Sequence, residues 1–171
     1  HFILEQSTVP DTVTVRVPSG TTFEAMVVHA VNDEALNLDY AVLNSQDFNY
    51  VPTLHSTDAE PYSGEDVSYT GNPNGLGLFT YRGYYLGRVD VGIKGLEGFG
   101  NTLAFDIQVS NGASGSIFLN SNGNAVAILA MRTITYADPY CLAVVPPVDV
   151  SFGQDIHTQV NDYILWLETS P

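Results

Sequence analysis

The sequence predicts an all-β domain whose strands close into a barrel similar to a β-trefoil. Short segments in which apolar and polar residues alternate, bounded by Gly, Asn, Ser and Pro, are typical of β-strands. Three segments, beginning near Phe23, Leu78 and Ile117, repeat the order strand, polar turn, strand, and the last two start about forty residues apart. Such repetition favours a closed barrel, because closure removes exposed sheet edges. A two-sheet β-sandwich is the alternative.

Length and composition predict one domain that spans residues 1–171. Hydrophobic residues make up 44% of the chain and charged residues 14%, a balance that suits a compact core with neutral polar loops. A chain of this length can bury one substantial core, and the sequence contains neither linkers nor low-complexity tracts.

Alternation is strictest near the beginning of the chain. In Thr12–Val17 the valines fall on one face of a predicted strand, and Pro18-Ser19-Gly20 supplies turn residues at its end. Phe23–Val31 and Leu36–Leu43 are two further predicted strands, joined by the polar turn 32–34. This first unit is therefore expected to contain a hairpin.

The segment Asn44–Gly75 lacks a clear apolar period and is predicted to be a long surface loop, the kind of segment on which binding surfaces are often built. Exposed aromatic faces stack on sugar rings while neighbouring carboxylates bond hydroxyl groups, although alternating aromatics also fill cores. The candidate ligand-binding residues are the loop side chains that combine these chemistries: Tyr50, His55, Tyr62, Glu65, Asp66 and Tyr69.

The stretch Leu76–Ala143 is predicted to hold most of the remaining strands. Within it, Leu78–Leu86 and Ile117–Ile128 each have the pattern of a strand, a turn around a glycine and a return strand. The individual strands are expected near Gly77–Tyr81, Tyr84–Val91, Thr102–Val109, Ser116–Leu119 and Ala125–Ala130.

A last pair of strands is predicted at Tyr140–Val145 and Tyr163–Leu167. Only Asp155–Asp162 has even a weak helical pattern, so the domain is expected to be overwhelmingly β.

The charge balance excludes two classes of partner. Nineteen acidic residues against five basic ones give a formal net charge of −14. Because the five cations form no cluster, neither nucleic acid nor an anionic membrane is an expected partner. Acidity of this kind suits solubility in an acidic external medium, and the sequence has no apolar segment of membrane length. The sequence does not predict the oligomeric state.

His1 is the sharpest candidate for a metal ligand. An N-terminal histidine offers its α-amino nitrogen and a ring nitrogen to one ion, and a second histidine would complete a copper site. The opening His1-Phe2 resembles the histidine brace of lytic polysaccharide monooxygenases, with His29, His55 or His157 as the partner. The other interpretation is that His1 only marks where a leader or a tag was cut off, which suits a mature secreted protein. Copper is accordingly the alternative to a protein without a cofactor.

The nucleophiles and carboxylates form no complete catalytic motif. Gly112-Ala-Ser-Gly-Ser116 lacks the final glycine of a Gly-x-Ser-x-Gly elbow and is interpreted as a turn. Cys141 lies in an apolar run, which indicates a buried, inert thiol. Paired carboxylates such as Glu65-Asp66 would suit a glycoside hydrolase, which is the second alternative function. We therefore assign no catalytic residue, and the sequence favours a protein that is not an enzyme.

The order of motifs in Leu76–Ala143 resembles that of a group of fungal surface proteins. An apolar strand and turn precede Gly87-Arg88, then Phe105-Asp106, the turn Ser116–Gly123 and Tyr140-Cys141. This order is similar to the C-terminal domain of yeast PIR-type cell-wall mannoproteins and to the PhiA or IgE-binding-protein group. The family's further cysteines and glutamine-containing repeats are absent, so covalent attachment to the wall is not expected. The resemblance implies a secreted fungal protein, extracellular or cell-wall-associated, without enzymatic activity, with cell-wall polysaccharide as the expected ligand.

Overall fold

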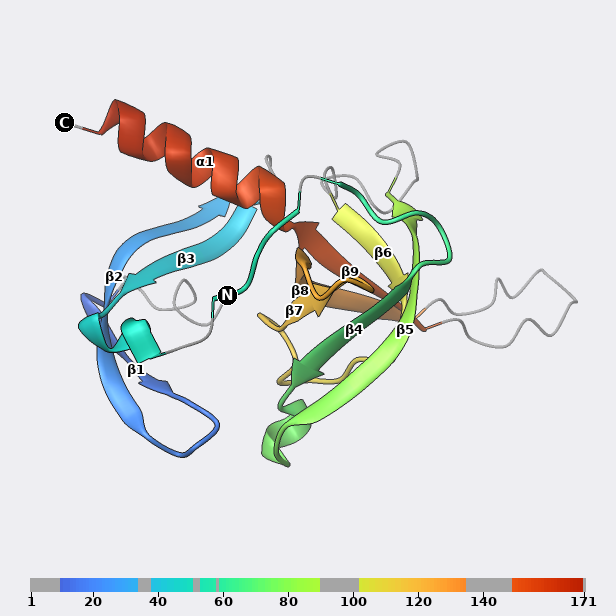
Figure 1. Ribbon diagram of the computed structural model, residues 1–171, viewed down its shortest axis with the longest axis horizontal. Coiled ribbons are helices and arrows are strands. Elements are labelled where there is room, and N and C mark those ends of the chain that lie inside the picture. Colours follow the sequence, from blue (N-terminus) through green and yellow to red (C-terminus); the bar gives the residue numbers. More distant parts are fainter. Residues whose placement is uncertain are drawn as a thin grey trace, which may run out of the picture.

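The protein consists of a closed β-barrel, a smaller β-sheet and a C-terminal helix (Figure 1). A computed structural model describes residues 10–33, 38–50, 53–57, 59–89, 102–134 and 149–170. The smaller sheet is antiparallel in the order β1-β2-β3, and it is followed by a short 3-10 helix, η1. These elements are β1 (Thr12–Arg16), β2 (Thr22–Asp33), β3 (Leu38–Asn44) and η1 (Gln46–Tyr50).

Six antiparallel strands close the barrel in the order β4-β5-β6-β9-β8-β7. A second 3-10 helix, η2, lies between the first two barrel strands, and the helix α1 follows the last strand directly. The bounds are β4 (Asp66–Gly71), η2 (Pro73–Gly75), β5 (Phe79–Arg88), β6 (Thr102–Asp106), β7 (Ile117–Leu119), β8 (Ala125–Ile134), β9 (Asp149–Asp155) and α1 (Ile156–Thr169).

The core of the barrel is aromatic. Tyr69, Tyr85, Phe105 and Phe118 are each no more than 1% exposed, and the rings of Phe105 and Phe118 stack with centroids 4.0 Å apart. The Tyr69 hydroxyl donates to the Gln108 carbonyl oxygen at 2.8 Å, so its polar end is satisfied inside the barrel. Burial raises the pKa of Tyr69 to about 12. These rings are therefore the neutral centre around which the strands close.

The prediction of a mostly β fold with a closed barrel is confirmed, but the β-trefoil is wrong. The unit that begins at Phe23 stays outside the barrel, because β2 pairs with β1 along one edge and with β3 along the other. The barrel is closed by pairs of strands far apart in sequence, such as β6 with β9, where Leu103 lies opposite Gly153. The strand rhythm thus repeats in the sequence, but the three units are not equivalent in space.

The predicted hairpin at Leu78–Leu86 is one continuous strand, β5. Gly83, which we interpreted as its turn, lies in mid-strand opposite Val67 of β4. On its other side β6 passes so close that a Cβ atom on Gly83 would lie 2.0 Å from the Asp106 carbonyl oxygen. Glycine is required there by the close approach of two strands, which the sequence pattern does not distinguish from a turn.

The other predicted hairpin, at Ile117–Ile128, is confirmed. Strands β7 and β8 are joined by a turn in which the Asn120 N–H donates to the Asn124 carbonyl oxygen at 2.9 Å and Gly123 has a φ of 79°. The predicted strands in residues 12–43 also match β1, β2 and β3 within a few residues. Strand β4, in contrast, lies inside the predicted loop Asn44–Gly75.

The predicted strand at Tyr163–Leu167 is wrong, because these residues belong to α1. Asp155 caps this helix by accepting a hydrogen bond from the His157 N–H at 3.0 Å. Trp166 packs against His29 of β2, with ring centroids 4.5 Å apart. Helix α1 therefore starts at the end of barrel strand β9 and runs across to the smaller sheet (Figure 1). The predicted strand Tyr140–Val145 lies outside the described residues.

Candidate functional site

Two consecutive turns between β6 and β7 place Ser114 on the surface. The first is closed by a hydrogen bond from the Ala113 N–H to the Ser110 carbonyl oxygen at 3.1 Å, and the second from the Ser116 N–H to the Ala113 carbonyl oxygen at 3.0 Å. Gly112 and Gly115 occupy the third positions of these turns with φ values of 85° and 84°, the conformation that a type II turn requires there. Ser114 is exposed at the second position of the second turn.

The two turns are held in place by a buried side chain and by backbone hydrogen bonds to neighbouring elements. Ala113 is 0% exposed and belongs to the barrel core, next to the exposed Ser114. The Gly115 N–H donates to the Leu129 carbonyl oxygen of β8 at 2.8 Å, and the Asn74 N–H of η2 donates to the Asn111 carbonyl oxygen at 2.7 Å. A serine between two such anchors is held in one position, which is the requirement for a preorganised nucleophile.

Two backbone N–H groups beside this serine have no acceptor within the described part of the chain: those of Gly112 and of Ser114 itself. Gly112 also packs closely on η2, since a Cβ atom there would lie 3.1 Å from the backbone nitrogen of Asn74. A pair of free N–H donors next to a hydroxyl group is the arrangement that binds a negatively charged oxygen.

The smaller sheet carries an aspartate to its boundary with the barrel. Asp39 lies near the start of β3 between the buried residues Leu38 and Tyr40. Its N–H donates to Gln154 Oε1 of β9 at 3.2 Å, and the same oxygen accepts from Gln159 Nε2 of α1 at 2.5 Å. Gln154 is 6% exposed and Gln159 is 3% exposed. A buried pair of amides thus fixes the backbone of Asp39 to the barrel and to the helix.

A second contact fixes the same strand. The Tyr40 hydroxyl donates to Asp162 Oδ2 of α1 at 2.6 Å, and burial together with this hydrogen bond raises the pKa of Tyr40. Adjacent residues of β3 are therefore held by β9 and α1, the two elements that end the described chain.

Comparison with known proteins decides the family. The model of the trypsin-like peptidase domain matches residues 1–128, which is more than half of the chain. The chain belongs to the trypsin-like peptidase domain family.

Two solved protease structures have a similar fold. The chain is similar to the HtrA-type protease AlgW with a decapeptide, with a TM-score of 0.69 and 18% identity over 94% of this chain. It is also similar to a serine endoprotease from Yersinia pestis, with a TM-score of 0.68 and 19% identity over 93% of this chain. The chain spans 45% and 50% of the lengths of these two proteins. No curated protein matches the chain.

Membership of the trypsin-like family overturns the functional predictions from sequence. The resemblance to the PIR and PhiA groups is wrong, and with it the expectation of a non-enzymatic, polysaccharide-binding protein of the cell wall. The motif order on which it rested consists of short strand and turn patterns that many β-barrels share. The alternatives, a copper protein or monooxygenase and a glycoside hydrolase, have no support in this family or fold either.

The structure disperses the loop residues that we expected to bind a ligand. Tyr62 is 71% exposed, and His55 and Asp66 are also exposed, whereas Tyr69 lies in the barrel core. Glu65 is 6% exposed and accepts from Ser121 Oγ at 2.8 Å, which fixes the loop to the β7–β8 turn. Tyr50 ends η1. Whether any of them binds a ligand stays a prediction.

The predicted metal ligand, His1, lies outside the described residues. Among the residues that are described, no three His, Cys, Asp or Glu side chains gather in a way that could hold a metal ion. His29 lies in an aromatic cluster with Tyr40, Tyr163 and Trp166, and His157 contacts Asn161 within α1. In the same part of the chain, no helix has the length and apolarity needed to cross a bilayer.

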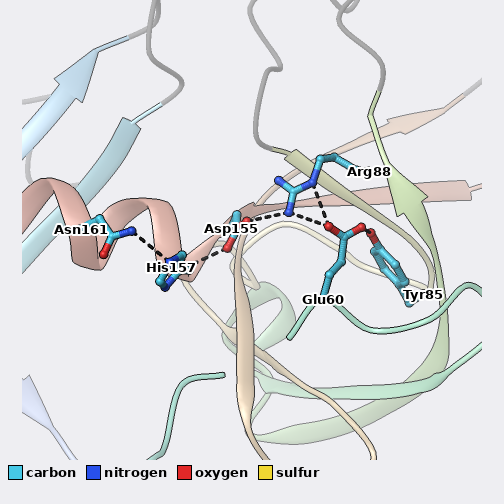
Figure 2. Close-up of polar contacts among 6 residues, drawn as sticks. All are labelled: Glu60, Tyr85, Arg88, Asp155, His157 and Asn161. Carbon is cyan, nitrogen blue, oxygen red and sulfur yellow. Dashed lines mark hydrogen bonds and ion pairs between the residues drawn. The ribbon is translucent and has the colours of Figure 1, made fainter. Parts of the chain in front are cut away.

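A polar network joins the barrel to the start of α1. Figure 2 shows Arg88 of β5 between two carboxylates, with Nη2 lying 2.8 Å from Glu60 Oε2 and 2.8 Å from Asp155 Oδ2. The Tyr85 hydroxyl also donates to Glu60. Partial burial would raise the pKa of Glu60, but the hydrogen bonds from Tyr85 and Arg88 outweigh it and lower that pKa. We interpret this network as a structural contact that holds β5 against the start of α1.

Sequence reasoning missed both Ser114 and Asp39. Ser114 was weighed only against the Gly-x-Ser-x-Gly elbow, whereas the relevant signal was a serine with a glycine two positions before it and another directly after it. Asp39 begins Asp-Tyr-Ala-Val-Leu, a single acid on an otherwise apolar strand, and we counted it only as part of the net charge.

Proposed function

We propose that this protein is a serine peptidase in which Ser114 attacks the carbonyl carbon of a peptide bond. The observation that carries this proposal is the pair of turns that exposes Ser114 beside the N–H groups of Gly112 and Ser114, in a chain of the trypsin-like family. In serine peptidases of the chymotrypsin type, the oxyanion is bound by the N–H of the serine and that of the glycine two positions earlier. Gly112 and Ser114 have this spacing.

The order of residues along the chain selects the partners of Ser114. Chymotrypsin-type triads run His, Asp, Ser, so the histidine must precede the aspartate. Asp39 precedes Ser114, and its backbone is fixed where the smaller sheet meets the barrel. Two histidines precede Asp39: His1 and His29.

The register of β2 and β3 argues against His29 as the base. Asp39 lies opposite Asn32, while His29 lies opposite Val42, three residues further along the sheet. That offset separates them by about 10 Å, too far for a direct hydrogen bond between their side chains. His1 is the remaining histidine, and residues 1–128, which match the family, contain it together with Asp39 and Ser114.

In the proposed reaction, His1 accepts the proton of Ser114 Oγ as that oxygen forms a bond to the substrate carbonyl carbon. The Gly112 and Ser114 N–H groups donate to the oxyanion that develops, and Asp39 orients the histidine and stabilises its positive form. The tetrahedral intermediate then collapses to an acyl-enzyme, and the departing amine takes its proton from His1. Water releases the acyl group by the same steps in reverse.

Peptide hydrolysis by matched variants tests the proposal. Ser114→Ala should lower kcat/KM at least about 10⁴-fold, because the nucleophile is lost. Ser63→Ala removes an exposed serine hydroxyl that contacts only the Leu86 carbonyl oxygen among the described residues, and it should keep the activity of the parent protein. Release of an N-terminal amine from peptides by both variants at equal rates would refute Ser114 as the nucleophile.

A further inference from the structure

A groove lies beside Ser114, the proposed nucleophile, and residues of the barrel form its walls. Its volume is about 490 Å³, which falls in the range of about 300–1,000 Å³ found for small-molecule sites. Ser114 forms part of its wall, and the other walls come from the end of β4, the approach to β5 and strand β7. A molecule in this groove therefore touches the turn that carries the nucleophile.

The chemistry of the groove is apolar and neutral. Four aliphatic side chains line it: Leu54, Leu78, Ile117 and Leu119. None of the described residues that line it is charged, although the chain as a whole carries a formal charge of −14. Leu54 and Leu78 are 53% and 56% exposed, so the groove leaves two large apolar side chains in contact with water. Covering them would be favourable, because it removes apolar surface from solvent.

The floor of the groove is backbone. Gly71 lies there, and a Cβ atom on it would lie 2.8 Å from Ser116 Oγ and 3.4 Å from Ala113 Cβ. Gly115 also lines the groove, and a Cβ atom there would meet nothing within 4 Å. Gly71 thus lets the end of β4 pack closely against the turn that carries Ser114, whereas Gly115 leaves open space directly after that serine.

We propose that this groove binds an apolar side chain of the substrate peptide, at a position within a few residues of the cleaved bond. The inference rests on the proposed function, because the occupant is identified by its connection to the bond that Ser114 attacks. Leu78 is then a residue that determines specificity: its side chain contacts the substrate and rejects acidic residues at the position that enters the groove.

The test is a peptide library in which each position near the cleavage site is varied between Leu, Ala, Lys and Asp. The parent protein should show one position at which kcat/KM for Leu exceeds that for Asp by about tenfold or more, as expected for burial of an aliphatic group. Leu78→Lys should reduce this ratio at that position alone, because the lysine favours an acidic side chain there. Leu86→Lys, which places the same charge at an exposed leucine of β5 outside the groove, should keep the ratio.

The outcomes separate this inference from the proposed function. If no peptide is cleaved in a Ser114-dependent manner, both are overturned. If cleavage depends on Ser114 but shows no preference for Leu over Asp near the bond, the groove proposal alone is overturned. The same holds if Leu78→Lys and Leu86→Lys change the ratio equally, since the effect would then be one of total charge.

Discussion

At the scale of single residues, the site depends on glycines and amides more than on charged groups. Gly112 and Gly115 adopt positive φ values that let two turns follow each other, and the buried Ala113 holds them on the core. The sequence allowed a turn to be predicted here, because glycine spacing is local. It did not reveal the role that we propose for Ser114, because the proposed partners, Asp39 and His1, lie far from this serine in the sequence.

Gln154 is a residue whose role the sequence does not indicate. We expect Gln154→Leu to remove the acceptor for the part-buried Asp39 N–H and for the buried side-chain amide of Gln159. The free energy of unfolding should fall by about 1–3 kcal/mol. If Asp39 orients the catalytic histidine, kcat should also fall, by roughly tenfold, while KM changes little. Chemical denaturation and steady-state kinetics measure the two effects separately.

Gln108→Leu is the matched control for this prediction, because Gln108 is exposed and only its backbone oxygen contacts Tyr69. It should leave both stability and kcat unchanged. A Gln154→Leu variant with lowered stability but unchanged kcat would show that Gln154 acts as a structural residue alone.

At the scale of elements, strict alternation of apolar and polar residues predicted strands reliably, whereas glycine did not distinguish a turn from a close approach of two strands. Thr12–Val17 and Ile117–Ile128 were predicted correctly because their burial alternates and their turns are local. Strand β4 was missed because its buried residues, Val67 and Tyr69, stand in a polar segment and gain their partners from β5 and β7. The weak helical pattern at Asp155–Asp162 marked the first half of α1, but its second half was predicted as a strand because its aromatic residues pack on His29, far away in sequence.

Gly83 tests whether β5 is one strand. Gly83→Ala should destabilise the barrel by more than about 3 kcal/mol, because the new Cβ atom meets the backbone oxygen of Asp106 and no side chain can move to relieve it. Gly75→Ala serves as the control, since Gly75 has a φ of 73° but open space around it. It should cost only about 1–2 kcal/mol of backbone strain. Urea denaturation measures both, and equal losses would contradict the close approach of β5 and β6.

At the scale of the whole molecule, two polar contacts connect the smaller sheet to the rest of the described chain: the Asp39 N–H donates to Gln154 of β9, and the Tyr40 hydroxyl donates to Asp162 of α1. Arg88 separately joins β5 to the start of α1. The sequence gives a formal net charge of −14, but that value does not indicate which carboxylates form ion pairs. The closed barrel was predictable from the strand pattern, whereas the separate sheet was not, because the sequence repeat does not encode which strands pair.

The Arg88 network predicts how stability depends on pH. The pKa of Glu60 is lowered in the folded state. Its ionised form therefore stabilises the folded protein at pH values above the ordinary glutamate pKa of 4.5, and this stabilisation is lost as the pH falls through the pKa of the folded state. Arg88→Gln should therefore reduce the difference in urea midpoint between pH 7 and pH 3.5. The effect should be small, because both side chains are more than a third exposed and screened by solvent.

Arg82→Gln makes the same change of charge on the same strand and lies outside the network. It should leave that pH difference as it is in the parent protein. If both variants reduced it equally, the cause would be net charge and not the contact between Arg88 and Glu60.

The most direct measurement for the central claim is covalent labelling by a fluorophosphonate, which reacts with activated serine hydroxyls and with ordinary ones far more slowly. Intact-mass spectrometry of the parent chain should show addition of one phosphonyl group, and peptide mapping should place it on Ser114. Ser114→Ala should remove the label, His1→Ala should slow it strongly, and Ser63→Ala should leave its rate unchanged. Labelling that persists in Ser114→Ala, or none in the parent chain, would contradict the account.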